Sequence, residues 1–323
     1  MTFVLAALLS NSAADLEPGR ELRQEGEIEE AIVFFEESLA SEPDSAETQR
    51  ELGHCLALAG RYTEAIEMYG NLAASQDLQW QLEAAKWTGL TQLYLGNVEA
   101  SLEQSRLEAR LAVQLGESSA AARAARHVGY VHAELSQFSE ANTAFVAALD
   151  GNPNDLDTLY LVGLLSARQG DWGSLRYQVM DLEPVVRRSG NSDGMRRIDH
   201  LKAELALARG DAREANELLE NASGSKNALY EETHARAYYE QGDLAQAEAT
   251  LRSILDATDE RLEFPLLYVK ALLGMAKLLD AQEQGEEAAS FYRRFLEHWE
   301  NAVGPLPGVV EARSRLQQLE AQS

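Results

Sequence analysis

Residues 122–155, ARAARHVGYVHAELSQFSEANTAFVAALDGNPND, are predicted to form two helices joined by a short turn. Apolar residues recur on both sides of Ser136 at the spacing of one face of an α-helix. The small residues Gly129 and Ala141 fall where the two helices must approach closely, and Phe145 fills the groove that results. This stretch therefore predicts a helical hairpin.

Seven other segments of the chain align with this unit on the turn between its helices. The eighth position of each unit holds Gly19, Gly53, Gly89, Gly129, Gly163, Ala203, Ala235 or Ala276. The twentieth position holds Ala31, Ala65, Ser101, Ala141, Leu175, Ala215, Ala247 or Ala288. The turn, at the fifteenth position, holds Gly26, Gly60, Gly96, Ser136, Gly170, Gly210, Gly242 or Glu283, and in the last unit the glycine is displaced to Gly285. Glycine at the turn favours the left-handed conformation that ends a helix, and the fixed period indicates a repeat architecture.

This pattern resembles the tetratricopeptide repeat, in which small residues recur at the eighth, twentieth and twenty-seventh positions of each unit. The resemblance covers roughly residues 12–302, with departures such as Leu72 and Leu182 at the twenty-seventh position. It implies an all-α fold, a right-handed superhelical solenoid of about eight helix–turn–helix units with a C-terminal capping helix. Residues 291–299 resemble the end of repeat regions in many bacterial proteins, which suggests a repeat protein of bacterial type.

The alignment divides the chain into three parts. Residues 1–14 form an apolar N-terminal segment, either signal-like or a capping helix; residues 15–302 form the repeat solenoid; and residues 303–323 form the capping helix. The fifth unit is irregular near residues 171–195, because Pro184 is expected to interrupt its second helix and a flexible turn follows. We expect either a long loop or a hinge there.

The composition disfavours several classes of function. A net charge of −25 opposes binding to nucleic acid or to an anionic membrane. No apolar run of ~18 residues occurs, so no membrane span is expected. The single cysteine, Cys55, excludes an internal disulfide and a cysteine-based metal site. A cytoplasmic location is expected, with export to the periplasm as the alternative if residues 1–14 are the remnant of a signal peptide.

The sequence contains no motif typical of catalysis. No phosphate-binding glycine loop or zinc-type His-Glu-x-x-His motif occurs. His127 and His132 diverge by roughly 140° around a helix, so they are poorly placed to share a metal. The acidic residues are spread along outward faces, which is typical of solvation rather than of acid–base chemistry. We therefore predict a noncatalytic protein with no cofactor and no metal.

In the family that this pattern resembles, the first helix of each unit lines a concave groove, and five positions of each unit point into it. Here those positions hold eleven basic residues, which are Arg20, Arg23, Arg50, Lys86, Arg123, Arg126, Arg168, Arg197, Arg236, Lys270 and Lys277. They hold eight acidic residues, which are Glu47, Glu83, Glu134, Asp157, Glu204, Glu232, Glu240 and Asp280. The resemblance therefore implies a neutral to basic groove in an acidic chain.

The densest part of this groove, in the third to fifth units, is the predicted site for a partner. Its residues are Lys86, Leu90, Tyr94, Arg123, Arg126, Tyr130, Tyr160 and Arg168. Arginine and tyrosine are typical interface anchors, since they combine forked donors with rigid amphipathic area. We expect this patch to bind a protein or peptide with an acidic segment. The alternative is that these arginines neutralise neighbouring glutamates along a solvated wall.

These observations favour a protein–protein interaction scaffold or adaptor that binds a partner segment in its groove. The alternative is a regulatory or sensor module whose groove binds a small molecule or a signalling peptide, with a change of pitch at the fifth unit. An enzyme or enzyme subunit is a third reading, and no motif supports it. No oligomeric state is predicted.

Overall fold

A computed structural model describes residues 15–222, 228–299 and 308–321; the apolar segment 1–14 lies outside the described residues. Every regular element within the described ranges is a helix. The helices are α1 (Glu17–Glu25), α2 (Ile28–Ser41), α3 (Ala46–Leu58), α4 (Tyr62–Ala73), α5 (Leu78–Tyr94), α6 (Val98–Leu115), α7 (Ser118–Glu134), α8 (Phe138–Leu149), α9 (Leu156–Arg168), α10 (Trp172–Ser189), α11 (Ser192–Ala208), α12 (Ala212–Ala222), α13 (Ala228–Gln241), α14 (Leu244–Asp256), α15 (Asp259–Glu263), α16 (Pro265–Ala281), α17 (Gly285–Trp299) and α18 (Val309–Glu320). None of them is both long enough and apolar enough to cross a membrane.

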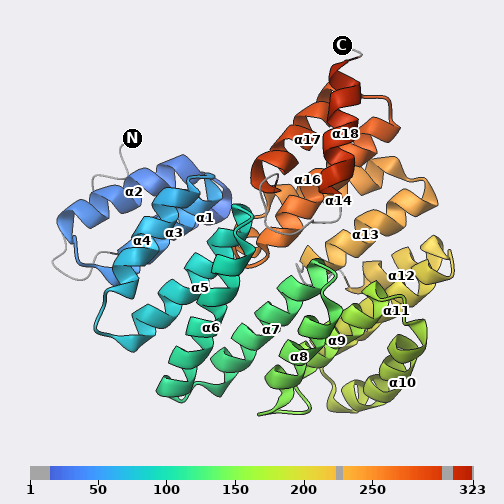
Figure 1. The fold of residues 1–323 in the computed structure, drawn as a ribbon, viewed down its shortest axis with the longest axis horizontal. Helices are drawn as coiled ribbons and strands as arrows, with labels where there is room; N and C mark the ends of the chain where they lie inside the picture. Colours follow the sequence, from blue (N-terminus) through green and yellow to red (C-terminus); the bar gives the residue numbers. More distant parts are fainter. Residues whose placement is uncertain (1–14, 223–227, 300–307, 322–323) are drawn as a thin grey trace.

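The helices form eight consecutive pairs, from α1 with α2 to α16 with α17. The short helix α15 is inserted between the seventh and eighth pairs, and α18 follows the last pair and packs on α17. Figure 1 shows that the pairs follow a curved path, which brings α16 back beside α5. The predicted all-α repeat solenoid is confirmed, and the array nearly closes on itself.

Each pair turns at a residue in the left-handed conformation. The backbone φ angle is positive at all eight aligned turn positions, which are Gly26, Gly60, Gly96, Ser136, Gly170, Gly210, Gly242 and Glu283. Ser136 (φ 59°) and Glu283 (φ 61°) adopt this conformation at a steric cost that glycine avoids. The expected displacement of the last turn to Gly285 is wrong, because Gly285 is already the first residue of α17.

The two helices of a pair meet where the first helix has no room for a side chain. A Cβ atom at Gly129 would lie 2.5 Å from the ring of Phe145, and one at Gly53 would lie 2.5 Å from the ring of Tyr69. The residues at the twentieth position of all eight units are fully buried. Small residues at these two positions therefore set the distance between the paired helices.

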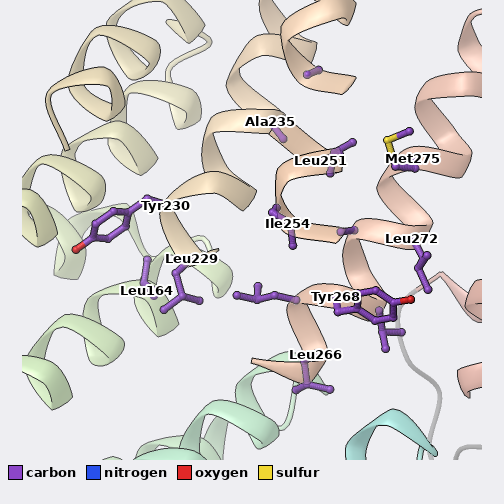
Figure 2. Close-up of a cluster of buried hydrophobic side chains, with 14 of the residues drawn as sticks. Leu164, Leu229, Tyr230, Ala235, Leu251, Ile254, Leu266, Tyr268, Leu272 and Met275 are labelled. Atoms are coloured by element: carbon purple, nitrogen blue, oxygen red, sulfur yellow. The ribbon is translucent and has the colours of Figure 1, made fainter. Parts of the chain in front are cut away.

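The pairs share extended apolar cores rather than forming one core each. The largest cluster of buried side chains runs from Leu93 in α5 to Leu319 in α18. Figure 2 shows the part of this cluster where side chains from α9, α13, α14 and α16 lie close together. Helix α18 buries Val309, Ala312 and Leu319 and so covers the end of the array, as a terminal repeat requires.

The fifth pair is more regular than the sequence indicates. Helix α10 runs unbroken through Pro184, so the predicted interruption is wrong. Pro184 lies on the exposed side of the helix, where the carbonyl group of Met180 that it leaves without an amide partner can be hydrated. The expected long loop is reduced to a short junction: Gly190 ends α10 in the left-handed conformation, and the side chain of Asn191 accepts a hydrogen bond from the amide of Gly194 to begin α11.

We expect Gly129→Ala to destabilise the fold and Gly70→Ala to stabilise it. The methyl group added at Gly129 must displace Phe145, at a cost of about 1–3 kcal/mol. Gly70 lies within α4, but a Cβ atom there meets nothing within 4 Å, so alanine gains about 0.5–1 kcal/mol of helix stability. Urea-induced unfolding followed by circular dichroism measures both variants. A midpoint for Gly129→Ala at or above that of the wild type would contradict the helix contact described here.

Candidate functional site

The groove positions of five first helices meet in one pocket on the inner side of the curve, which we call the central pocket. Side chains of α5, α7, α9, α11 and α13 form most of its wall, and α6, α15 and Phe264, the residue before α16, complete it. The pocket has a volume of about 310 Å³. This size suits one or two large side chains or a small ligand.

Six of the eight predicted site residues line the central pocket: Lys86, Leu90, Arg123, Arg126, Tyr130 and Tyr160. Arg168 lies in a second hollow on the same face. The Tyr94 side chain is buried; it stacks on Tyr62 with ring centroids 4.8 Å apart and donates a hydrogen bond to the carbonyl of Arg261. Tyr94 therefore joins the two ends of the array instead of facing the pocket.

The central pocket also contains residues that sequence reasoning did not include in the site. Arg197 and Leu229 occupy groove positions in the sixth and seventh units, beyond the units from which the predicted patch was drawn. Glu108 comes from the second helix α6, and Glu263 and Phe264 come from the insertion before the last pair. The repeat period could have identified the first two, but it carries no signal for an insertion between units.

Every basic residue counted along the groove forms an ion pair with a carboxylate of the chain. The pairs in and beside the central pocket are Lys86 with Glu263 (3.2 Å), Arg123 with Glu108 (2.9 Å), Arg126 with Asp155 (2.8 Å) and Arg197 with Asp157 (2.6 Å). Three of these carboxylates lie outside the groove positions, so they offset the positive excess that the groove count predicts. The wall of the pocket is a set of neutralised pairs.

Among the residues that line the central pocket, Nε2 of His127 has no hydrogen-bond partner within the described part of the chain, whereas the Tyr130 hydroxyl interacts with the carboxylate of Glu134. Tyr130 is 8% exposed, and burial raises the pKa of its hydroxyl well above the usual value, so this group keeps its proton. Burial, aided by the charge of Lys86, lowers the pKa of His127 to about 4, so the imidazole is neutral at pH 7. Burying a polar group without a partner costs about 1–3 kcal/mol. A ligand that supplied the partner would remove that cost.

The second hollow lies beside the central pocket and shares Leu229 with it. Its volume is about 420 Å³, and its charged lining residues are Arg168, Glu204, Glu232, Arg236, Glu240 and Lys270. The cations and carboxylates are equal in number and pair with one another, as in Arg236 with Glu204 and Lys270 with Glu232. This hollow therefore presents no net charge to a ligand.

A buried chain of hydrogen bonds connects the walls of the two hollows. The Tyr160 hydroxyl lies 2.5 Å from Nδ1 of His200, and Nε2 of His200 lies 2.7 Å from the Thr233 hydroxyl. The Thr233 hydroxyl donates to Glu204 (2.8 Å), so it must accept from Nε2 of His200. Burial lowers the pKa of His200 to about 4, so at neutral pH the ring is uncharged and its single proton is on Nε2.

Apolar side chains and paired charges line the two hollows. Within the described residues, no group of three His, Cys, Asp or Glu side chains is arranged to hold a metal ion. Cys55 is buried, which raises the pKa of its thiol to about 12 and leaves it protonated and unreactive at neutral pH. The central pocket also contains one unpartnered polar atom, Nε2 of His127.

Comparisons with known proteins agree with this architecture. Residues 22–85 and 232–302 each match a tetratricopeptide repeat family. A stretch of 90 residues is 28% identical to BBSome complex member BBS4 of Xenopus tropicalis and covers 28% of this chain and 17% of that protein. The chain thus corresponds to a small part of the length of that relative.

Two solved structures of similar fold cover nearly the whole chain. A tetratricopeptide repeat protein from Parabacteroides merdae has 17% identity and a TM-score of 0.41, covering 94% of this chain and 97% of its own. A Rap protein complexed with competence and sporulation factor has 12% identity and a TM-score of 0.48, covering 95% and 96%.

The paired helices, left-handed turns and close approaches at small residues define a helical repeat solenoid. With two separate matches to the repeat family, the chain contains tetratricopeptide repeats at residues 22–85 and 232–302. Repeats of this family support a general role as a scaffold for protein interaction.

We expect the stability of the fold to fall as the pH drops from 6.5 to 4, in part because of His200. The pKa of His200 is about 4 in the folded state, against 6.5 for an exposed histidine, so the unfolded state binds more protons between these values. His200→Gln should remove up to ~3 kcal/mol of this loss, since one pKa unit corresponds to about 1.4 kcal/mol. Urea unfolding at a series of pH values measures the difference, with His132→Gln, a change at a partly exposed ring, as the control. Equal losses in the His200→Gln variant and the wild type would contradict the neutral assignment.

Proposed function

We propose that this protein is a noncatalytic scaffold whose groove binds a segment of a partner protein at the central pocket. The observation that carries this proposal is Nε2 of His127, a buried polar atom of a residue that lines this pocket, without a partner among the described residues. Leaving such a group unpaired destabilises the unbound protein. Its presence is accounted for when a bound segment forms a hydrogen bond with it.

The apolar lining supports the same proposal. Leu90, Leu161, Leu229 and Phe264 line the pocket together with Tyr130 and provide a surface that gains free energy when a large side chain excludes water from it. The paired charges surround this surface and resemble the polar rim of a protein interface. A partner segment would therefore place a large apolar side chain in the pocket and polar groups at its edge.

The partner segment is further proposed to be acidic. Because each cation already has a carboxylate partner, an incoming carboxylate must replace an internal one. Among the carboxylates paired in and beside the central pocket, the most exposed are Glu263 and Asp157, with side chains 54% and 47% exposed. Replacing an exposed carboxylate requires little desolvation, so exchange is easiest at Lys86, Arg126 and Arg197.

A regulatory or sensor module is a second candidate, favoured by one feature of the pocket. Glu263 and Phe264 come from the last part of the array and close a pocket whose other walls belong to the third to seventh units. A small molecule or signalling peptide bound there would contact both parts of the array. A change in the radius of gyration on binding, measured by small-angle X-ray scattering, would favour this candidate over a rigid scaffold.

We expect His127→Leu to raise stability and to weaken partner binding. The change removes an unpartnered buried polar atom, so the melting temperature should rise, while loss of one hydrogen bond to a partner should weaken binding about fivefold, or about 1 kcal/mol. His234→Leu is the matched control, because Nε2 of His234 is also buried and unpartnered but lines neither hollow. Affinity capture from native cells with mass spectrometry identifies the partner, and calorimetry then measures its affinity for each variant. A partner that binds wild type, His127→Leu and His234→Leu alike would place its site elsewhere.

The charge of the partner segment is tested separately on an array of short peptides that cover the captured partner. Acidic peptides should bind better than neutral ones, and Arg126→Ala should reduce that preference, since Arg126 contacts both Asp155 and Asp157. Val146→Ala, on the exposed face of α8, is the control. If acidic and neutral peptides bind equally well to the wild type, the segment is not recognised by its charge.

A further inference from the structure

The segment 258–264, which contains α15, lies across the groove on the first units of the array. We call it the bridging segment. It follows the seventh helix pair, yet α15 contacts α3 and α5. The bridging segment is thus one of the contacts through which the end of the chain reaches its beginning; the packing of α16 beside α5 in Figure 1 is another.

Two acidic side chains of the bridging segment pair with basic groove residues. Asp259 lies 3.0 Å from Nε of Arg23, and Glu263 lies 3.2 Å from Nζ of Lys86. The two acids are four residues apart, so they project from the same side of one helical turn. Arg23 and Lys86 belong to the first and third units and occupy positions that face a partner in this family. The bridging segment therefore uses the groove as a partner would.

Two hydrogen bonds from side chains to backbone carbonyl groups also hold the bridging segment. The Tyr94 hydroxyl donates to the carbonyl of Arg261 (2.5 Å), and the Arg261 side chain donates to the carbonyl of Leu58 (2.8 Å). The first of these hydrogen bonds would form with any residue in place of Arg261, because it involves only the backbone carbonyl of the bridging segment. A different chain of the same shape could form it.

An apolar side chain anchors the segment between its two acids. Leu262 is 5% exposed and belongs to the same buried cluster as Leu58, Trp87 and Leu90. Removing this apolar side chain from water favours the contact. An acid, a leucine three residues later and a second acid after it are therefore the features that this surface recognises.

We propose that the surface formed by α1, α3 and α5 is a receptor for a short acidic helical turn of this kind, and that the bridging segment is its built-in occupant. The contact is autoinhibitory: a partner segment with the same acids and leucine binds only by displacing residues 258–264. This surface shares Lys86 and Leu90 with the central pocket, but it binds its ligand through Arg23, Tyr94 and the apolar residues around Leu262.

The tether gives the bridging segment its advantage over a partner. Its ion pairs involve acids that are about half exposed, with Asp259 at 49%, and such exposed pairs contribute little to binding. Covalent attachment instead presents the segment at an effective concentration on the order of millimolar. A partner overcomes this advantage when the residues that follow its acidic turn also enter the neighbouring central pocket.

The test uses the full-length chain with Asp259→Lys, Leu262→Ala and Glu263→Lys combined, and a fluorescent synthetic peptide with the wild-type sequence of residues 256–266. The variant should have a larger radius of gyration than the wild type and should bind the peptide at least about tenfold more tightly, because no tethered segment competes. The control peptide carries lysine in place of Asp259 and Glu263 and should not bind.

Three results would overturn the proposal: a variant that opens but binds both peptides alike, a variant that opens but binds neither, or a variant that keeps the wild-type radius of gyration and binds no peptide. Circular dichroism verifies the helical content of the variant. If the triple change unfolds the chain, Asp259→Lys with Glu263→Lys alters only two half-exposed side chains and is judged by the same readings. Because the peptide derives from this chain, the result is independent of whether a partner binds at the central pocket.

Discussion

The contact between the ring of Phe145 and the backbone at Gly129, where even a methyl group does not fit, is the constraint on which the structure depends. The same contact recurs between Gly53 and Tyr69, and alanine replaces glycine in the later units. Close approach fixes the angle within each pair, and stacking pairs of equal angle gives the array its curvature. That curvature brings α16 to α5 and so creates both the central pocket and the surface under the bridging segment.

The features that follow from the repeat period were predictable from the sequence. Even Ser136 and Glu283, which lack the expected glycine, adopt the left-handed turn that their position requires. Six of the predicted site residues lie together because the period also fixes which side chains share a face. The repeat period does not predict an insertion between units or the closure of the array. The burial of Tyr94 and the contribution of Phe264 to the pocket depend on these two features, so the sequence does not predict them. The predicted break at Pro184 does not occur, because proline is tolerated within a helix where it lies on the side that faces water, and the sequence alone does not show which side that is.

The net charge of the groove likewise depends on residues outside the groove positions of the repeat. Counting residues at groove positions gives an excess of cations, but Glu108 on α6 and Glu263 in the bridging segment reach into the groove from outside those positions. The arginines are consequently held in fixed geometries by internal carboxylates. Such a groove gains little from long-range attraction of an acidic partner and more from exchange of one carboxylate for another at a preformed site.

Closure of the array also affects when its surfaces become covered as the chain is made. In an open solenoid each unit contacts its neighbours, whereas here Glu263 meets Lys86 across 177 residues and Asp259 meets Arg23 across 236. At a synthesis rate of ~5–20 residues per second, the groove around Lys86 precedes its own occupant by roughly 10–35 seconds. The first helix pairs can fold from local contacts in that interval. A nascent chain therefore offers this surface to other molecules before the finished protein covers it.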